Sequence, residues 1–481
     1  MRVTTGVQPE RAQAAEQSRA RYPDEDGYVE RDGVRLFYEL YGEGERTLLF
    51  LPTWSIIHSR HWKAQIPYFA RHHRVLTFDG RGNGRSDRPH GADAYVARQF
   101  ADDALAVMDA TETESALLVC LSAGALWATL LAADHPDRVD GVAYIGAAVP
   151  LVPGHPERVR HPFEERHDTD EGWAKLNRHY WLRDYRGFLE FFFGRMFTEP
   201  HSTKQIEDCI GWGLETDPET MIDITRGLAP PEGFRETCER VRCPVMVIHG
   251  TEDAVRPHSG GAALAEVTGG ELVSLEGAGH GPHARDPVKV NLLLRDFVEP
   301  PRPKASAWTR GKSRRKRALY ISSPIGLGHA QRDVAIAKEL RRLVPDLEID
   351  WLAQDPVTRV LEGEGERIHP LSAELANESR HIESESAEHD LHCFQAWRRM
   401  DEILLANFMV FHDIVREHDY DLWIGDEAWE LDYYLHENPE QKRAAYVWLT
   451  DFVGWLPVED EGPLTADYNA EMIEQLSLIH I

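Results

Sequence analysis

The sequence predicts an α/β protein with a mainly parallel sheet, followed by a second α/β unit. From about residue 28 to residue 298, short apolar runs alternate with helical patterns, and the alternation begins again at residue 318. Strands that alternate with helices pair in parallel, because each helix carries the chain back over one face of the sheet. With 481 residues the chain is also long enough for two to four domains, at roughly 100–200 residues each.

The composition is that of an acidic globular protein. Lys and Arg number 53 against 81 Asp and Glu, a formal net charge of −28. This balance argues against nucleic acid or an anionic membrane surface as the main partner. The five cysteines show no zinc-site spacing, so we expect reduced thiols in a cytoplasmic protein.

In the first unit, residues 27–298, the expected strands are 47–52, 75–79, 116–121, 142–145, 245–249 and 272–275, and the clearest helices are 123–135 and 287–298. We expect residues 1–26 to form a mobile N-terminal arm. Between about 151 and 239 strand patterns disappear and aromatic residues become frequent, which predicts a helical cap. These rings form either the core of the cap or the lining of an apolar substrate pocket.

Residues 116–133 are uncharged and almost long enough to span a membrane. Ser122-Ala123-Gly124 interrupts them, so we predict a buried strand, a sharp turn and a buried helix. Cys120-Leu121-Ser122-Ala123-Gly124 then matches the pattern G-x-S-x-G, with Cys in place of the first glycine. Such a turn lifts the Ser122 hydroxyl above the sheet and directs the N–H of Ala123 at a developing oxyanion. The alternative is that Ser122 is only a turn residue.

Two later segments supply partners for a nucleophilic serine. His249-Gly250-Thr251-Glu252-Asp253 and Gly277-Ala278-Gly279-His280-Gly281 each follow an expected strand. We expect His280 to take the proton of Ser122, and Asp253 to orient His280 and stabilise its cation. A solvated Asp253 and a structural His280 are the alternatives, and the G-x-G-H pattern favours His280 over the nearby His283.

With the segment Asp79-Gly80-Arg81-Gly82-Asn83-Gly84-Arg85-Ser86, these motifs resemble the α/β-hydrolase superfamily over residues 28–298. The resemblance implies a capped serine hydrolase whose oxyanion hole uses Ala123 and, by position, Trp54. One departure is Pro52-Thr53, where many relatives carry His-Gly. Ser122 excludes the enzymes of this superfamily that use Asp as nucleophile at that position, so esters, thioesters, lactones or amides are the expected substrates. Cofactor-free haloperoxidases of this superfamily share the triad, so haloperoxidase activity is an open alternative. We expect no metal and no organic cofactor.

Residues 299–317 are expected to be a Pro-rich, basic linker. The second unit, residues 318–475, has expected strands at 318–322, 347–352, 421–425 and 445–449, a glycine-containing turn at 323–329 and a helix at 332–343. The segments 322–329 and 420–427 resemble the Rossmann-like N-terminal half of a GT-B glycosyltransferase. The resemblance implies that Gly326, Gly328 and His329 contact a sugar acceptor, with His329 as contact or base; the alternative for His329 is a structural role at a helix start. We expect Asp426 and Asp451, both at strand ends, to be loop acids; the alternative is that they are catalysts.

The sugar-nucleotide half is absent, so we do not expect this unit to transfer sugar by itself. Residues 476–481 do not fit the preceding pattern; we expect them to be a sequencing-adaptor artefact, with the natural protein continuing past Gln475. The predicted function is cleavage of an ester or related acyl bond in a small molecule with an apolar portion, without a membrane span. The alternatives are a non-catalytic ligand sensor, and a glycosyltransferase whose hydrolase unit trims an acyl group.

Overall fold

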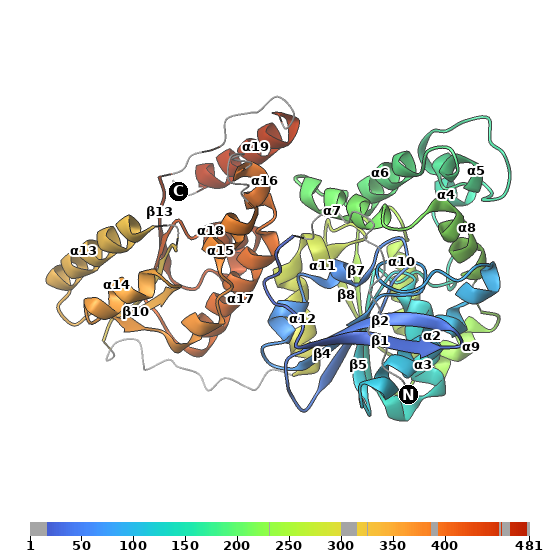
Figure 1. Ribbon diagram of the computed structural model, residues 1–481, viewed down its shortest axis with the longest axis horizontal. Helices are drawn as coiled ribbons and strands as arrows, with labels where there is room; N and C mark the ends of the chain where they lie inside the picture. The colour runs from blue at the N-terminus through green and yellow to red at the C-terminus, as the bar shows by residue number, and fades with distance from the viewer. Residues whose placement is uncertain are drawn as a thin grey trace.

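The computed structural model describes residues 17–229, 231–299, 315–324, 326–385, 393–451, 454 and 462–478. An eight-stranded sheet lies in the first unit and a five-stranded sheet in the second, and Figure 1 shows them in separate halves of the molecule. Within these ranges no helix combines the length and apolar character needed to cross a membrane. Most of the expected linker, residues 1–16 of the expected arm, and residues 479–481 lie outside the described residues.

The first sheet has the strand order β1-β2-β4-β3-β5-β6-β7-β8. All six predicted strands are confirmed, and the strands from β4 to β8 pair in parallel. Its strands are β1 Glu25–Arg31, β2 Val34–Tyr41, β3 Thr47–Phe50, β4 Arg74–Phe78, β5 Ala116–Leu121, β6 Val139–Ile145, β7 Val245–Gly250 and β8 Glu271–Leu275.

The antiparallel pair β1–β2 at the edge of this sheet was not predicted. Most of β1 is exposed or half-buried, so its sequence lacks the apolar run that marks an interior strand. The arm boundary predicted at residue 26 is therefore too late, because Glu25 and Asp26 already belong to β1. Further back, Arg19 is buried, and its Nη1 donates to Glu39 Oε1 at 2.8 Å.

The helices of the first unit divide into those that cover the sheet and those of the cap. The uncharged stretch is β5 followed by α3, both buried on all sides, which explains why neither shows an amphipathic pattern. The sheet is covered by α1 Ile66–Phe69, α2 Ala97–Ala110, α3 Gly124–Asp134, α10 His258–Thr268, α11 Pro282–Arg285 and α12 Pro287–Val298.

The predicted helical cap is present, with its helices grouped to one side of the sheet (Figure 1). Many of its aromatic rings pack on one another: Trp181, Phe188 and Phe193 are at most 1% exposed. These three rings are therefore cap core. The cap helices are α4 Pro156–Val159, α5 Arg178–Trp181, α6 Tyr185–Met196, α7 Thr203–Gly213 and α8 Pro218–Gly227. The last helix of the expected cap range, α9 Phe234–Glu239, packs instead against α3 and α10.

The second sheet is entirely parallel, with the order β11-β10-β9-β12-β13. Its four predicted strands are confirmed. Its strands are β9 Arg317–Ser322, β10 Glu348–Ala353, β11 Arg367–Ile368, β12 Leu422–Asp426 and β13 Ala445–Leu449, and its helices are α13 Leu327–Leu343, α14 Val357–Gly363, α15 Glu378–Glu385, α16 Cys393–Arg398, α17 Asp401–Glu417, α18 Trp429–Glu437 and α19 Gly462–Leu478.

The predicted turn over residues 323–329 is too long. Helix α13 begins at Leu327, so Gly328 and His329 lie in its first turn, and Gly326 is its N-cap residue in an extended conformation. Glycine lowers helix propensity, and this is why the local pattern predicted a loop here.

The two units meet where α17 begins. Arg60 Nη2 lies 2.6 Å from Glu402 Oε2, and both side chains are almost completely buried. Lys63 Nζ lies 2.5 Å from Asp401 Oδ2. A buried charge requires a partner in a defined place, so these pairs fix how the second unit is oriented on the first.

A buried ion pair also fixes the turn between β4 and α2. Arg81 Nε and Nη2 donate to the two carboxylate oxygens of Asp103 at 2.6 Å each, and Asp103 is fully buried. On the same helix, Asp109 pairs with Arg138 but is exposed.

The Asp103→Ala substitution would leave Arg81 buried without its carboxylate partner. We expect it to lower the free energy of unfolding by about 3–5 kcal/mol, measured by urea denaturation. The matched substitution Asp109→Ala breaks an exposed pair and is expected to cost about 0–1 kcal/mol. Equal losses in the two variants would contradict this account of the turn.

Candidate active site

Ser122 lies at the carboxyl end of β5, in the centre of the first sheet. Its φ of 51° is in the left-handed region, which is unusual for a residue with a side chain. The Ser122 N–H donates to Ile145 O at 2.9 Å, and its carbonyl accepts from Ala148 N at 3.0 Å. The strained turn is thus held by the segment that follows β6, as expected of a strained residue at a functional site.

The turn at Ser122 leaves no room for larger side chains around it. Helix α3 begins only two residues later, at Gly124. A Cβ at Gly124 would lie 3.0 Å from Pro52 O and 3.1 Å from the Cβ of Cys120. Cys120 is fully buried in place of the usual glycine. Because Gly124 has no side chain, there is space for the side chain of Cys120.

Asp253 follows β7, and its buried carboxylate has a partner on each oxygen. Oδ1 accepts from the backbone N–H groups of Val255 and Arg256, both at 2.8 Å. Oδ2 lies 2.7 Å from His280 Nδ1 and 3.1 Å from His249 Nε2. Burial alone would raise the pKa of Asp253, but the two imidazoles outweigh it and hold that pKa below its ordinary value.

His280 follows β8, and its ring is held against the segment that also anchors Ser122. A Cβ at Gly146 would lie 3.1 Å from His280 Nδ1 and 2.9 Å from its carbonyl oxygen. Gly146 comes directly after Ile145, the residue that accepts the Ser122 N–H. The structure therefore pairs His280 with Asp253 and places one segment, residues 145–146, against both Ser122 and His280.

In the described residues no hydrogen bond joins the Ser122 hydroxyl to His280. Catalytic hydrogen bonds are often long in ligand-free enzymes and shorten when substrate binds. The other candidate histidine, His283, is paired elsewhere: its Nε2 lies 3.2 Å from His61 Nδ1. Burial, with a smaller contribution from His280, lowers the pKa of His283 to about 3, so it is neutral at pH 7.

The segment at Trp54 is held against the elbow by three hydrogen bonds. Leu51 N donates to Val119 O at 2.9 Å, the Thr53 hydroxyl donates to Leu121 O at 2.8 Å, and Trp127 Nε1 donates to Pro52 O at 3.0 Å. Thr53 thus fixes the loop without the His-Gly pair of many relatives. Among the described residues, the N–H of Trp54 has no acceptor.

The N–H of Ala123 also has no acceptor in the described part of the chain. Ala123 is the N-cap residue of α3, so its N–H is one of the donors that no carbonyl within the helix satisfies. Together with Trp54 it gives two free donors beside the Ser122 turn.

Cap residues contact both the Trp54 loop and the His280 loop. The Trp54 ring packs on Phe192 at 5.3 Å and on Trp181 at 6.1 Å between ring centroids. The N–H of His280 donates to Met196 O at 2.9 Å, and Glu199 Oε1 accepts from Gly279 N at 2.6 Å. The position of the cap therefore helps to set the position of His280.

The model of one protein family, described as the alpha/beta hydrolase fold, matches residues 46–287, half of the chain. The chain belongs to this family. The AB hydrolase superfamily protein YisY of Bacillus subtilis is 28% identical over 274 residues, covering 55% of this chain and 95% of that protein. The bifunctional esterase/perhydrolase DCH of Acinetobacter calcoaceticus is 26% identical over 280 residues, covering 56% and 99%.

Among solved structures, one titled "Est816 as an N-Acyl homoserine lactone degrading enzyme" shares 28% sequence identity with this α/β hydrolase. The alignment covers 56% of this chain and 100% of the chain in that structure, with a TM-score of 0.47.

In the second unit, the structure brings His329 to the end of β12. Its Nδ1 lies 3.0 Å from Asp426 Oδ2, and Arg332 also pairs with Asp426. Asp426 lies at the end of a strand, as predicted, but it is fully buried and not a solvated acid. Asp451 is exposed, as predicted, and pairs with Arg332 at 2.8 Å. Gly326 and Gly328 contribute backbone at the start of α13.

Sequence reasoning missed the second imidazole on Asp253. His249 precedes Asp253 by four positions at the end of β7, and it is fully buried. The local signal was the unusual histidine at the end of a buried apolar strand. Glu199 and Gly146 carried no recognisable local signal, since each acts through a contact with a distant loop.

The pKa of Asp253 predicts how stability depends on pH. Because its folded-state pKa is lowered, its stabilisation is complete above its unfolded pKa of about 4 and is lost as the pH falls through the folded value. We expect the difference in unfolding free energy between the wild type and Asp253→Asn to shrink as the pH is lowered from about 6 to below 4. Glu252→Gln, an exposed neighbour, serves as the control. A difference that does not change with pH would contradict the expectation.

Proposed function

We propose that the first unit is a serine hydrolase that cleaves ester-type bonds, with Ser122 as nucleophile, His280 as general base and Asp253 as the residue that orients His280. The observation that carries the proposal is the buried Asp253–His280 pair, held on the segment that anchors the strained Ser122. This arrangement suits acyl transfer, because a serine needs an adjacent base to become nucleophilic at neutral pH.

In the proposed reaction, Ser122 Oγ attacks the acyl carbonyl carbon while His280 Nε2 takes the hydroxyl proton. The carbonyl oxygen becomes an oxyanion that accepts hydrogen bonds from the N–H groups of Ala123 and Trp54. His280 then gives the proton to the departing alcohol oxygen, and the acyl group stays on Ser122. Water then attacks the acyl carbon while His280 takes one of its protons. The bond between the acyl carbon and Ser122 Oγ breaks, the carboxylic acid leaves, and His280 returns the proton to Oγ.

The substrate we propose is a small ester or lactone with an apolar portion. The names of the relatives support this class, since they include an esterase/perhydrolase, a 3-oxoadipate enol-lactonase and a pimeloyl-[acyl-carrier protein] methyl ester esterase. The half-buried Trp54 ring and the adjacent cap rings support the apolar portion, because they place aromatic surface beside the proposed oxyanion donors.

A fluorophosphonate probe tests for an activated serine. We expect it to label the wild-type chain and the control Ser115→Ala, but not Ser122→Ala, with all three showing the same circular dichroism spectrum. On p-nitrophenyl acetate, we expect Ser122→Ala or His280→Ala to lower kcat by about 10⁴–10⁶-fold. A folded wild type that neither takes the label nor turns over esters, but binds ligand, would favour the ligand-sensor alternative.

For the second unit we propose the N-terminal half of a GT-B type glycosyltransferase, in which Gly326, Gly328 and His329 contact the sugar acceptor. Two observations support it. In the strand order β11-β10-β9-β12-β13 the direction of winding reverses between β9 and β12, where ligands bind in open α/β sheets. The His329–Asp426 pair lies at that point.

The gene sequence downstream of the codon for Gln475 tests this second proposal. We expect it to encode a further α/β unit with a phosphate-binding turn, which would bind the sugar nucleotide. A stop codon within a few residues would contradict the glycosyltransferase proposal and leave the hydrolase proposal unaffected.

A further inference from the structure

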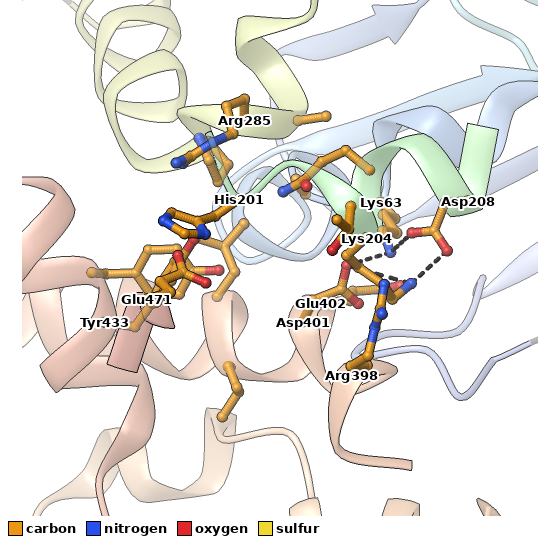
Figure 2. A pocket seen from close by; sticks show the side chains of 18 of the residues that line it. Lys63, His201, Lys204, Asp208, Arg285, Arg398, Asp401, Glu402, Tyr433 and Glu471 are labelled. Atoms are coloured by element: carbon orange, nitrogen blue, oxygen red, sulfur yellow. Dashed lines mark hydrogen bonds and ion pairs between the residues drawn. The ribbon is translucent and has the colours of Figure 1, made fainter. Parts of the chain in front are cut away.

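A cavity of about 140 Å³ lies between the two units. Helices α7 and α11 of the hydrolase line one side, and α16 to α19 line the other (Figure 2). Ser122, Asp253 and His280 are not among the residues that line it. The space is comparable to an apolar cavity of about 150 Å³ that holds a benzene molecule.

The cations of this cavity are already paired. Lys63 lies between Asp208 and Asp401, at 2.6 and 2.5 Å, and Lys204 pairs with Asp208. Arg285, labelled in the upper part of Figure 2, pairs with Glu437 at 2.8 Å.

The fourth cation, Arg398, lies 2.9 Å from Glu207. Each of the four is therefore compensated by a carboxylate, and none requires an anionic ligand.

Glu471 is a carboxyl group without such a partner. It is 9% exposed, and its Oε1 is buried with no hydrogen-bond partner. Burial raises its pKa to about 7, against the weaker opposite effects of His201 and Arg285. Figure 2 shows Glu471 beside Tyr433 and His201, where it lines the cavity. Asp432 Oδ1 also lacks a hydrogen bond and lines the same space, 3.4 Å from His436 Nδ1. A buried carboxylate that lacks a counter-charge is costly, so a cationic ligand would stabilise it.

Aromatic rings of α16, α18 and α19 also line the cavity. Trp397 packs edge-on against Tyr468 at 4.7 Å and against Trp429 at 6.2 Å between ring centroids. Tyr433 and Tyr434 line the same space. The faces of such rings attract cations, and aromatic cages of this composition recognise ammonium groups.

We propose that this cavity is a binding site for a small organic cation, an ammonium group on a compact apolar skeleton, recognised by the aromatic rings and by Glu471. A neutral apolar molecule would leave the Glu471 carboxyl buried without a partner, and an anion would be repelled by it. The site is separate from the proposed hydrolase chemistry, so its occupancy does not depend on Ser122.

Choline and its uncharged isostere 3,3-dimethylbutan-1-ol test the charge requirement, because the two molecules have nearly the same shape. Isothermal titration calorimetry on the full chain at pH 8 measures both. We expect choline to bind at least tenfold more tightly than the isostere, and equally well to the Ser122→Ala variant. Equal affinities for the two molecules, or no binding of choline, would overturn the proposal.

Two substitutions test the location. Glu471→Gln and Trp397→Leu are each expected to weaken choline binding at least tenfold, while Glu474→Gln, an exposed carboxylate on the same helix, leaves it unchanged. Thermal melting checks that each variant folds. If Glu471→Gln does not fold, the affinity of Trp397→Leu for choline still tests the location, and the isostere comparison still tests the charge requirement. Unchanged affinity in a folded Glu471→Gln variant would refute the assignment of the cation to this cavity.

Discussion

Parallel pairing of β5, β6, β7 and β8 is the constraint on which the candidate active site depends. Since the carboxyl ends of parallel strands meet at one edge of a sheet, Ser122, Asp253 and His280 reach the same edge from positions up to 158 residues apart. The pairing also explains the shape of the elbow. β5 lies between two neighbours and must pass directly into α3, so the chain turns through a left-handed residue at Ser122.

Burial then decides the electrostatics of the site. Asp253 is removed from water, so it needs donors on both oxygens, and the backbone at residues 255–256 and two imidazoles supply them. This fixes Nδ1 of His280 as the nitrogen that faces the acid, so that Nε2 is the one to which the proposed mechanism assigns the proton transfer. The cap takes part through Met196 and Glu199, because both bind the backbone of the loop that carries His280.

Between the two units, some buried charged groups have partners and one carboxyl group does not. At the start of α17 the buried charges are matched, as in Arg60–Glu402 and Lys63–Asp401, and they orient the second unit. Around the neighbouring cavity the cations are matched but the Glu471 carboxyl is not. A buried carboxyl group without a partner, beside aromatic rings, is the feature on which the proposed binding site rests.

The sequence by itself determined the elements whose signal is local. The apolar runs of β5 and β7, the small residues of the Ser122 turn and the short motifs that contain Asp253 and His280 can each be recognised within a few residues. The β1–β2 edge was missed because an exposed strand lacks an apolar run, and the start of α13 was missed because Gly328 weakens the helical pattern.

Only the tertiary structure decided what depends on pairing across the chain. It assigned His249 to Asp253, His283 to His61, and Glu402 to Arg60, 342 positions away. Each of these choices follows from burial: a charged or polar group removed from water takes whichever complementary partner the fold brings within reach. The fold, and not the neighbouring residues, determines which partner that is.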